Sequence, residues 1–282
     1  MTSRTTVITV TYNSAQVIKG MLASIPAQTP VIVVDNASTD GISEVAEEFP
    51  NAKLIRKDTN EGFGRACNQG AADVESDYLL FLNPDARLQP GALDALETTA
   101  EMYPNFGAAN PLIKNSNGKA RLKMTSPLPI PSMPRPALDQ IGEMPVLSGG
   151  VLFVHRTAFE KIGGFDPAIF LYHEDHDLCL RLKRAGYSLW HFPKAEASHA
   201  AGTGSPRTAQ IARWKGYQMA RSRYHVLEKS MPGTGFRQTF WPALLGLLGP
   251  TNFLSNRRRA KYLGQIQGAL SARKDGGKFG GT

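Results

Sequence analysis

Residues 79–85 read Leu-Leu-Phe-Leu-Asn-Pro-Asp, and this stretch decides the fold. Four consecutive apolar residues predict a short strand that is buried on both faces. Asn83, Pro84 and Asp85 end it, because proline lacks the N–H group that a central strand needs. The sequence therefore places a carboxylate at the C-terminal tip of a core strand, the edge where open α/β sheets bind ligands.

The first hundred residues alternate between strand and helix patterns around this stretch. Apolar and β-branched runs predict strands at 6–12, 31–34, 52–56 and 79–82. Helical spacing of apolar residues follows each run, with Thr39-Asp40 as the expected cap of one helix and a helix at 65–74. This alternation predicts an α/β fold with a Rossmann-like, mostly parallel sheet flanked by helices.

The second hundred residues are less regular. Six prolines between Asn115 and Pro145 indicate a long loop, which is either a lid over a site or an inert surface excursion. Beyond it, we expect a helix from Glu174 to about Ala185 and a strand at 188–192 that Pro193 stops.

The C-terminal part predicts helices. The expected division is a catalytic domain at 1–205, with a nucleotide-binding half at 1–105 and an acceptor half at 106–205. A helical region at 206–274 and a disordered, Gly-rich tail at 275–282 follow.

Composition narrows the functional classes. The 282 residues carry a formal net charge of +8, which suits anionic partners. We find no nucleic-acid-binding module, no signal peptide and no apolar run of roughly 18 residues that would span a membrane. We therefore expect a cytoplasmic protein. Its two cysteines, Cys67 and Cys179, are expected to be reduced thiols.

Acidic and imidazole groups stand at the ends of the predicted elements. Asp35 and Asp85 each end a strand, Glu174-Asp175 opens a helix, and His199 lies in a loop of small residues. Each alone is more often a structural residue. Together they supply the parts that sugar transfer from a nucleoside diphosphate requires: Asp35 for the base, Asp85 and His199 for a divalent metal, and a carboxylate as general base.

The order of several motifs resembles the family 2 glycosyltransferases of GT-A fold, especially their bacterial rhamnosyltransferase-like members. The resemblance covers about residues 6–205. The matching pieces are Thr11-Tyr12-Asn13, Val34-Asp35-Asn36-Ala37-Ser38-Thr39-Asp40, Asn60-Glu61-Gly62-Phe63-Gly64, Leu82-Asn83-Pro84-Asp85, Ser148-Gly149-Gly150, Gly163-Gly164-Phe165-Asp166 and Glu174-Asp175-His176-Asp177-Leu178.

The resemblance implies an inverting glycosyltransferase with Asp175 as catalytic base and Glu174 as its acidic neighbour. Asp85 and His199 would hold Mg²⁺ or Mn²⁺. The residues implied to bind the nucleotide sugar are Thr11, Tyr12, Asn13, Asp35, Asn36, Arg65, Asn68, Asn83, Asp85, Ser148, Gly149 and Gly150. The first carboxylate of the family's metal-binding motif is an amide here, Asn83, which puts metal dependence in question.

The expected donor is a dTDP- or UDP-linked sugar, with dTDP-rhamnose as the best single guess. The acceptor would be a glycan or a lipid-linked glycan in the synthesis of cell-envelope polysaccharide. The alternatives are a nucleotidyltransferase and a non-catalytic carbohydrate-binding or membrane-adaptor relative. Strand one ends in Tyr12-Asn13-Ser14, which lacks the Gly-rich basic loop typical of nucleotidyltransferases.

The segment 236–248 and the following Arg257–Arg259 support two interpretations. Its tryptophan and leucines could enter the headgroup region of an anionic membrane while the arginines meet lipid phosphates. That interpretation predicts a peripheral protein on the inner face of the cell membrane. Alternatively, the segment packs on the catalytic domain or forms a homodimer contact.

Overall fold

The structure is a computed structural model, and it describes residues 3–200, 207–249, 252 and 255–276. The strands are β1 (Thr5–Thr11), β2 (Val31–Asp35), β3 (Ala52–Arg56), β4 (Tyr78–Leu82), β5 (Ala86–Leu88), β6 (Phe106–Lys114), β7 (Gly142–Glu143), β8 (Val151–His155) and β9 (Ser188–His199). The helices are α1 (Ala15–Leu22), α2 (Ile42–Glu47), α3 (Phe63–Ala71), α4 (Ala92–Ala100), α5 (Arg156–Lys161), α6 (Glu174–Arg184), α7 (Ala209–Ser230), α8 (Gly235–Leu248) and α10 (Asn256–Lys274).

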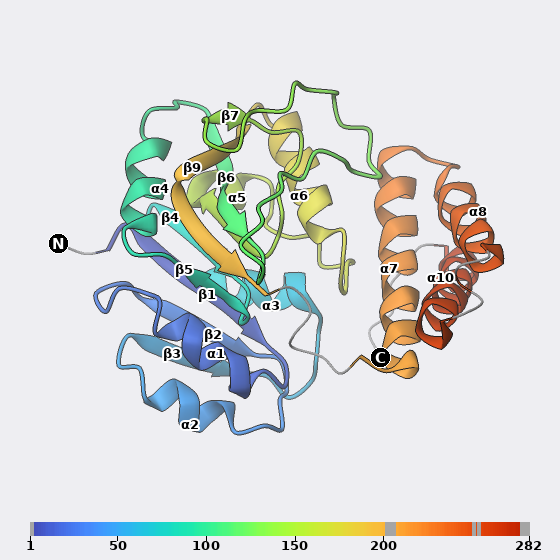
Figure 1. Ribbon diagram of the computed structural model, residues 1–282, viewed down its shortest axis with the longest axis horizontal. Helices are drawn as coiled ribbons and strands as arrows, with labels where there is room; N and C mark the ends of the chain where they lie inside the picture. The colour runs from blue at the N-terminus through green and yellow to red at the C-terminus, as the bar shows by residue number, and fades with distance from the viewer. Residues whose placement is uncertain (1–2, 201–206, 250–251, 253–254, 277–282) are drawn as a thin grey trace.

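The strands form one mixed sheet of nine in the order β3-β2-β1-β4-β8-β6-β9-β5, with β7 paired to β9 (Figure 1). The first four strands in this order are parallel, as the alternation predicts. From β8 onward most pairings are antiparallel, and β6 with β9 is the exception. The fold class predicted from the sequence is confirmed, because the sheet is flanked by helices and the C-terminal helices are present.

Strand side chains alternate between two hydrophobic cores, one on each face of the sheet. Leu80 and Leu82 join the core on the side of α1 and α4. Leu79 and Phe81 join the other core, on the side of α3, α5 and α6. The apolar run at 79–82 is therefore buried on both faces, as its sequence predicts. The two cysteines are free and buried in the second core.

Two local predictions are wrong, for identifiable reasons. Pro193 does not end its strand: β9 continues to His199, and its register against β6 shifts between Phe192 and Glu196. A β-bulge there accommodates the missing N–H. Asp40 does not cap the helix that follows it; its Oδ2 accepts a hydrogen bond of 2.7 Å from Ala15 N at the start of α1, and Gly41 precedes α2.

The C-terminal helices α7, α8 and α10 pack side by side at the edge of the molecule (Figure 1). α7 and α10 run parallel, since Arg213 contacts Gln267, Tyr217 contacts Ser271 and Arg221 contacts Asp275. Asp275, at the start of the predicted tail, lies 2.8 Å from Arg221. Residues 277–282 of that predicted tail lie outside the described residues.

Candidate active site

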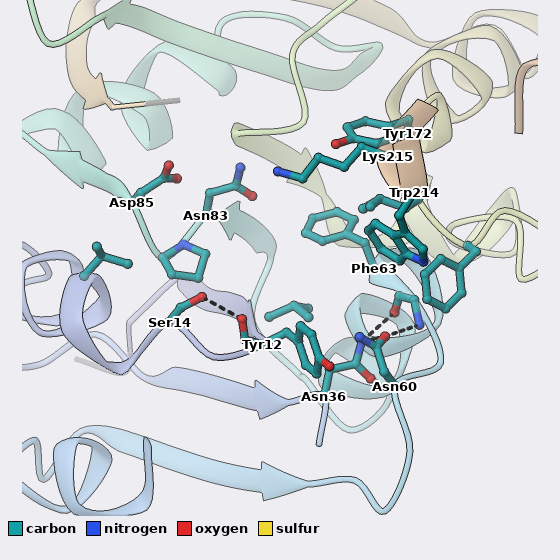
Figure 2. Close-up of a pocket in the computed structure, with 16 residues that line it drawn as sticks. Tyr12, Ser14, Asn36, Asn60, Phe63, Asn83, Asp85, Tyr172, Trp214 and Lys215 are labelled. Atoms are coloured by element: carbon teal, nitrogen blue, oxygen red, sulfur yellow. Dashed lines mark hydrogen bonds between the residues drawn. The ribbon is translucent and has the colours of Figure 1, made fainter. Parts of the chain in front are cut away.

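A cavity of about 270 Å³ opens at the C-terminal ends of β1, β2 and β4 (Figure 2). Four residues implied by the resemblance line it: Tyr12 after β1, Asn36 after β2, and Asn83 and Asp85 after β4. The cavity therefore lies at the sheet edge to which residues 79–85 point.

Asp85 and His199 meet beside this cavity although they are far apart in the chain. Asp85 Oδ1 lies 3.0 Å from His199 Nε2, and Asn83 Nδ2 lies 3.3 Å from the same nitrogen. The pairing of β5 with β9 places Ala86 opposite His199 and so brings the two groups together.

This pair fits a divalent ion shared with a substrate. Mg²⁺ is usually bound through one or two carboxylates, while water and phosphate oxygens complete its shell. Across the residues that the structure describes, no group of three or more His, Cys, Asp or Glu side chains forms a self-sufficient metal site. Asp85 and His199 would therefore hold the ion together with donor phosphates.

Gly149 and Gly150 link the Asp85–His199 pair to the predicted base. Gly149 N donates a 3.0 Å hydrogen bond to Asp175 Oδ2, and Asn83 N donates one of the same length to Gly150 O. A Cβ on Gly150 would lie 2.5 Å from His199 Cε1, so the imidazole packs directly on the backbone. Asn110 holds this turn, because its amide bonds both Ser148 N and Ser148 O.

The pKa values of the two carboxylates at the N-terminus of α6 are shifted in opposite directions. Burial would raise the pKa of Asp175, but Lys123 lies 2.6 Å away and, with His176 and the Gly149 N–H, holds that pKa well below its usual range. Burial, reinforced by the charge of Asp175, raises the pKa of Glu174. The surroundings therefore favour the ionised form of Asp175 and the protonated form of Glu174.

Lys123 belongs to the proline-rich loop, for which the sequence left a lid and an inert excursion open. The loop contacts the predicted base through Lys123, and Ser126 Oγ lies 2.7 Å from His176 Nδ1 on α6. Leu128 of the same loop is buried against Ile169 and Val226. The loop is thus packed on α6 and α7, next to the predicted catalytic helix.

Asn36 lines the cavity, whereas Thr11, Asn13 and Asp35 do not, and hydrogen bonds connect this part of the sheet edge. Asn36 joins the loops, since its Nδ2 donates to Asn60 Oδ1 and its Oδ1 accepts from Glu61 N. Thr11 O accepts from Asn36 N. Asn13 accepts from Thr39 N, and the fully buried Asp35 accepts from Ser38 N. Asp35 Oδ2 lies 3.3 Å from Arg56 Nε, and base binding by Asp35 remains a prediction.

Arg65 and Asn68 contact a turn rather than the cavity. Arg65 Nε donates to Pro167 O at 2.7 Å, and the amide of Asn68 bonds both Phe165 N and Phe165 O. Neither side chain lines the cavity. The resemblance implied nucleotide contacts for both, but the geometry supports a role in holding the turn at 165–167.

The sequence did not identify the opposite wall of the cavity. This wall comes from Phe170 to Tyr172 and from Trp214 and Lys215 on α7 (Figure 2). Ser222 Oγ of α7 donates to Leu171 O and holds the two parts together. No local motif marks Trp214 or Lys215 as site residues, because the docking of α7 places them there.

Comparisons with known proteins agree with this architecture. The profile of Glycosyl transferase family 2 matches residues 6–163, and that of Glycosyl transferase family group 2 matches residues 136–253. An N-acetylglucosaminyl-diphospho-decaprenol L-rhamnosyltransferase of Mycobacterium tuberculosis is 32% identical over 253 residues, covering 75% of this chain and 81% of that protein. Rhamnosyltransferase WbbL of Escherichia coli is 25% identical over 69% of this chain and 83% of its own.

Solved structures share the fold at low sequence identity. GalNAc-T7 with UDP, GalNAc and Mn²⁺ superposes with a TM-score of 0.65 at 15% identity, over 95% of this chain and 56% of its own. A mannosyltransferase of Pyrobaculum calidifontis with GDP-Man and Mn²⁺ gives 0.58 at 18% identity, over 98% and 76%. The profile match and the relative at 32% identity show that this chain belongs to glycosyl transferase family 2, as a rhamnosyltransferase-like glycosyltransferase of GT-A fold.

Proposed function

We propose that this glycosyltransferase moves rhamnose from a dTDP- or UDP-linked donor to a glycan or lipid-linked glycan, with inversion at the anomeric carbon. The observation that supports it best is that Asp175 and the Asp85–His199 pair contact adjacent glycines: Asp175 bonds Gly149 N, and His199 packs on Gly150. The relatives in Mycobacterium tuberculosis and Escherichia coli, both named rhamnosyltransferases, support the choice of sugar.

In this proposal the residues divide the work across the cavity. Tyr12 and Asn36 border the nucleotide, while Asp85 and His199 face its diphosphate. A divalent ion bound there would act as a Lewis acid that neutralises charge on the leaving diphosphate. Asp175 accepts the proton of the acceptor hydroxyl as the hydroxyl oxygen attacks the anomeric carbon from the face opposite the leaving diphosphate. An inverting transfer needs only this one base.

Thermal unfolding with nucleotides is the direct test of the donor. We expect dTDP or UDP to raise the melting temperature more than GDP or CDP, and Mg²⁺ or Mn²⁺ to increase the shift. A ligand at 100 times its Kd adds about 2.7 kcal/mol to the free energy of unfolding, which is readily measured. The experiment uses each nucleotide with the metal and with EDTA.

The outcomes separate the parts of the proposal. A shift in melting temperature of the same size with the metal and with EDTA would support the nucleotide pocket but contradict metal binding by Asp85 and His199. No shift with any nucleotide would contradict the donor class. A larger shift with GDP than with dTDP or UDP would indicate that the donor carries guanine rather than thymine or uracil.

We further propose that α8 and the start of α10 contact an anionic membrane surface at the inner face of the cell membrane. Trp241, Leu245 and Leu248 are 52%, 68% and 60% exposed and share one face of α8, since they are spaced by four and three residues. Arg257, Arg258 and Arg259 are exposed at the start of α10. In the described part of the chain, no helix is long and apolar enough to cross a bilayer.

Replacing Leu245 and Leu248 by glutamate is expected to weaken binding to anionic vesicles at least tenfold. Two exposed apolar side chains become charged, and both are repelled by the lipid. Cosedimentation with phosphatidylglycerol-containing vesicles measures the effect. The matched control is Met102→Glu, which changes an equally exposed apolar residue in the catalytic domain. Equal vesicle binding by all three proteins would leave packing or dimer formation as the role of this face.

A further inference from the structure

Lys215 brings a positive charge from the C-terminal helices into the active-site cavity. It lies on α7 and lines the same cavity as Asn83 and Asp85. In Figure 2 its side chain extends from the side of Trp214 and Tyr172, and its amino group is directed toward Asn83. The lysine therefore approaches the end of β4 from the wall opposite the sheet.

The amino group of Lys215 makes no hydrogen bond or ion pair with residues 3–200, 207–249, 252 and 255–276, although the residue is partly buried. Other lysines near the site are paired: Lys123 with Asp175 at 2.6 Å, and Lys229 with Asp166 at 2.6 Å. Burial and the nearby Arg257 lower the pKa of Lys215, while Asp85 opposes them. Partial burial of an ammonium group costs free energy unless the group is paired with an anion.

The charge on the opposite wall makes a diphosphate the fitting anion. Asn83 stands where the family motif has a carboxylate, so Asp85 is the single acidic group that β4 delivers into the cavity. Exchanging a carboxylate for an amide removes one negative charge, and Lys215 adds one positive charge. The cavity is thus better suited to a diphosphate than a site with two carboxylates and no lysine.

We propose that Lys215 binds the diphosphate of the sugar donor and stabilises it as the leaving group; this inference rests on the proposed function. During transfer, the bond between the anomeric carbon and the β-phosphate oxygen breaks, and its electron pair stays on that oxygen. The acceptor oxygen forms the new bond, and its proton goes to Asp175. Lys215 meets the negative charge that grows on the leaving diphosphate.

This role gives the C-terminal helices a part in the chemistry. Trp214 and Lys215 stand next to each other on α7, and α10 packs along that helix at the same level. The cation is thereby supplied by a helix outside the sheet, whereas Asp85 and His199 come from the sheet itself. Two separate parts of the chain enclose the proposed diphosphate position.

The test compares dTDP and dTMP binding to the wild-type enzyme and to Lys215→Met, by calorimetry with Mg²⁺ and with EDTA; UDP and UMP replace them if the wild-type enzyme prefers uridine. We expect the variant to bind the diphosphate at least tenfold more weakly in both conditions and the monophosphate with little change. Lys215→Arg, which keeps the charge, should restore most of the affinity. Lys261→Met is the matched control, because Lys261 is exposed on α10.

The outcomes distinguish this inference from the function on which it rests. If the wild-type enzyme binds neither dTDP nor UDP, the proposed function fails, and the role of Lys215 fails with it. If the wild-type enzyme binds a diphosphate and Lys215→Met binds it equally well, only the role of Lys215 is overturned. Equal losses for diphosphate and monophosphate would also overturn it, since they indicate a damaged pocket rather than a lost phosphate contact.

Discussion

Asp175→Asn is expected to lower the rate of sugar transfer by about 10²–10⁴-fold while leaving nucleotide binding nearly unchanged. Asparagine has the size of aspartate and still offers an oxygen to Gly149 N and Lys123 Nζ, which contact Oδ2 at 3.0 and 2.6 Å. The variant therefore keeps the turn between Asp175 and His199 but cannot accept the acceptor's proton. Single-turnover transfer and dTDP or UDP titration measure the two quantities separately.

Glu174→Gln is the matched control for this prediction. Burial, followed by the charge of Asp175, raises the pKa of Glu174, and glutamine imitates the protonated form that this environment favours. We expect its transfer rate to fall much less than that of Asp175→Asn. The reverse pattern, with Glu174→Gln inactive and Asp175→Asn active, would transfer the role of base to Glu174.

The pH dependence follows from the same contacts. Although burial opposes it, Lys123 keeps the pKa of Asp175 below its usual range, so the base stays ionised as the pH falls from 7 to 5. The acid limb of the rate profile should therefore lie below pH 5. A low pKa also limits basicity, and the Lys123 contact thus sets both the charge and the strength of this base.

The sheet was predictable from the sequence wherever strand and helix patterns alternate locally. The strand at 52–56 is reproduced residue for residue, and β4 extends the predicted 79–82 by one residue. β6 was missed because Asn110 and Pro111 interrupt its apolar pattern, although Asn110 is buried and clamps the turn at Ser148. The bulge at Pro193 could not be predicted, because it depends on pairing with β6.

The candidate site was predictable to the extent that its groups end strands. Asp85 and His199 lie together as the resemblance implied, while their metal binding remains a prediction. The resemblance implied nucleotide contacts for Arg65 and Asn68, which remain a prediction; their side chains bond the backbone at 165–167. Lys215 and Trp214 were missed because their position follows from tertiary docking of α7, which no local pattern encodes.

Gly264→Leu is expected to lower the free energy of unfolding by about 3 kcal/mol and to detach α10 from α7. A Cβ at Gly264 would lie 2.0 Å from Arg213 O, and one at Gly216 would lie 2.2 Å from Lys261 O. The two helices therefore meet backbone to backbone. A non-glycine residue gains at most about 1 kcal/mol of helix propensity at this position. The steric cost outweighs this gain, so the substitution lowers the free energy of unfolding.

The consequences of Gly264→Leu extend to the cavity, because the same stretch of α7 carries Trp214 and Lys215. We expect faster amide hydrogen exchange in α10 and in the first half of α7, together with weaker binding of the donor diphosphate. Lys261→Leu, one turn earlier on the exposed face of α10, controls for added apolar surface. If Gly264→Leu unfolds and binds the nucleotide like the wild-type protein, the close contact is dispensable, and α7 holds its place through Ser222 and its ion pairs to Asp166 and Asp177.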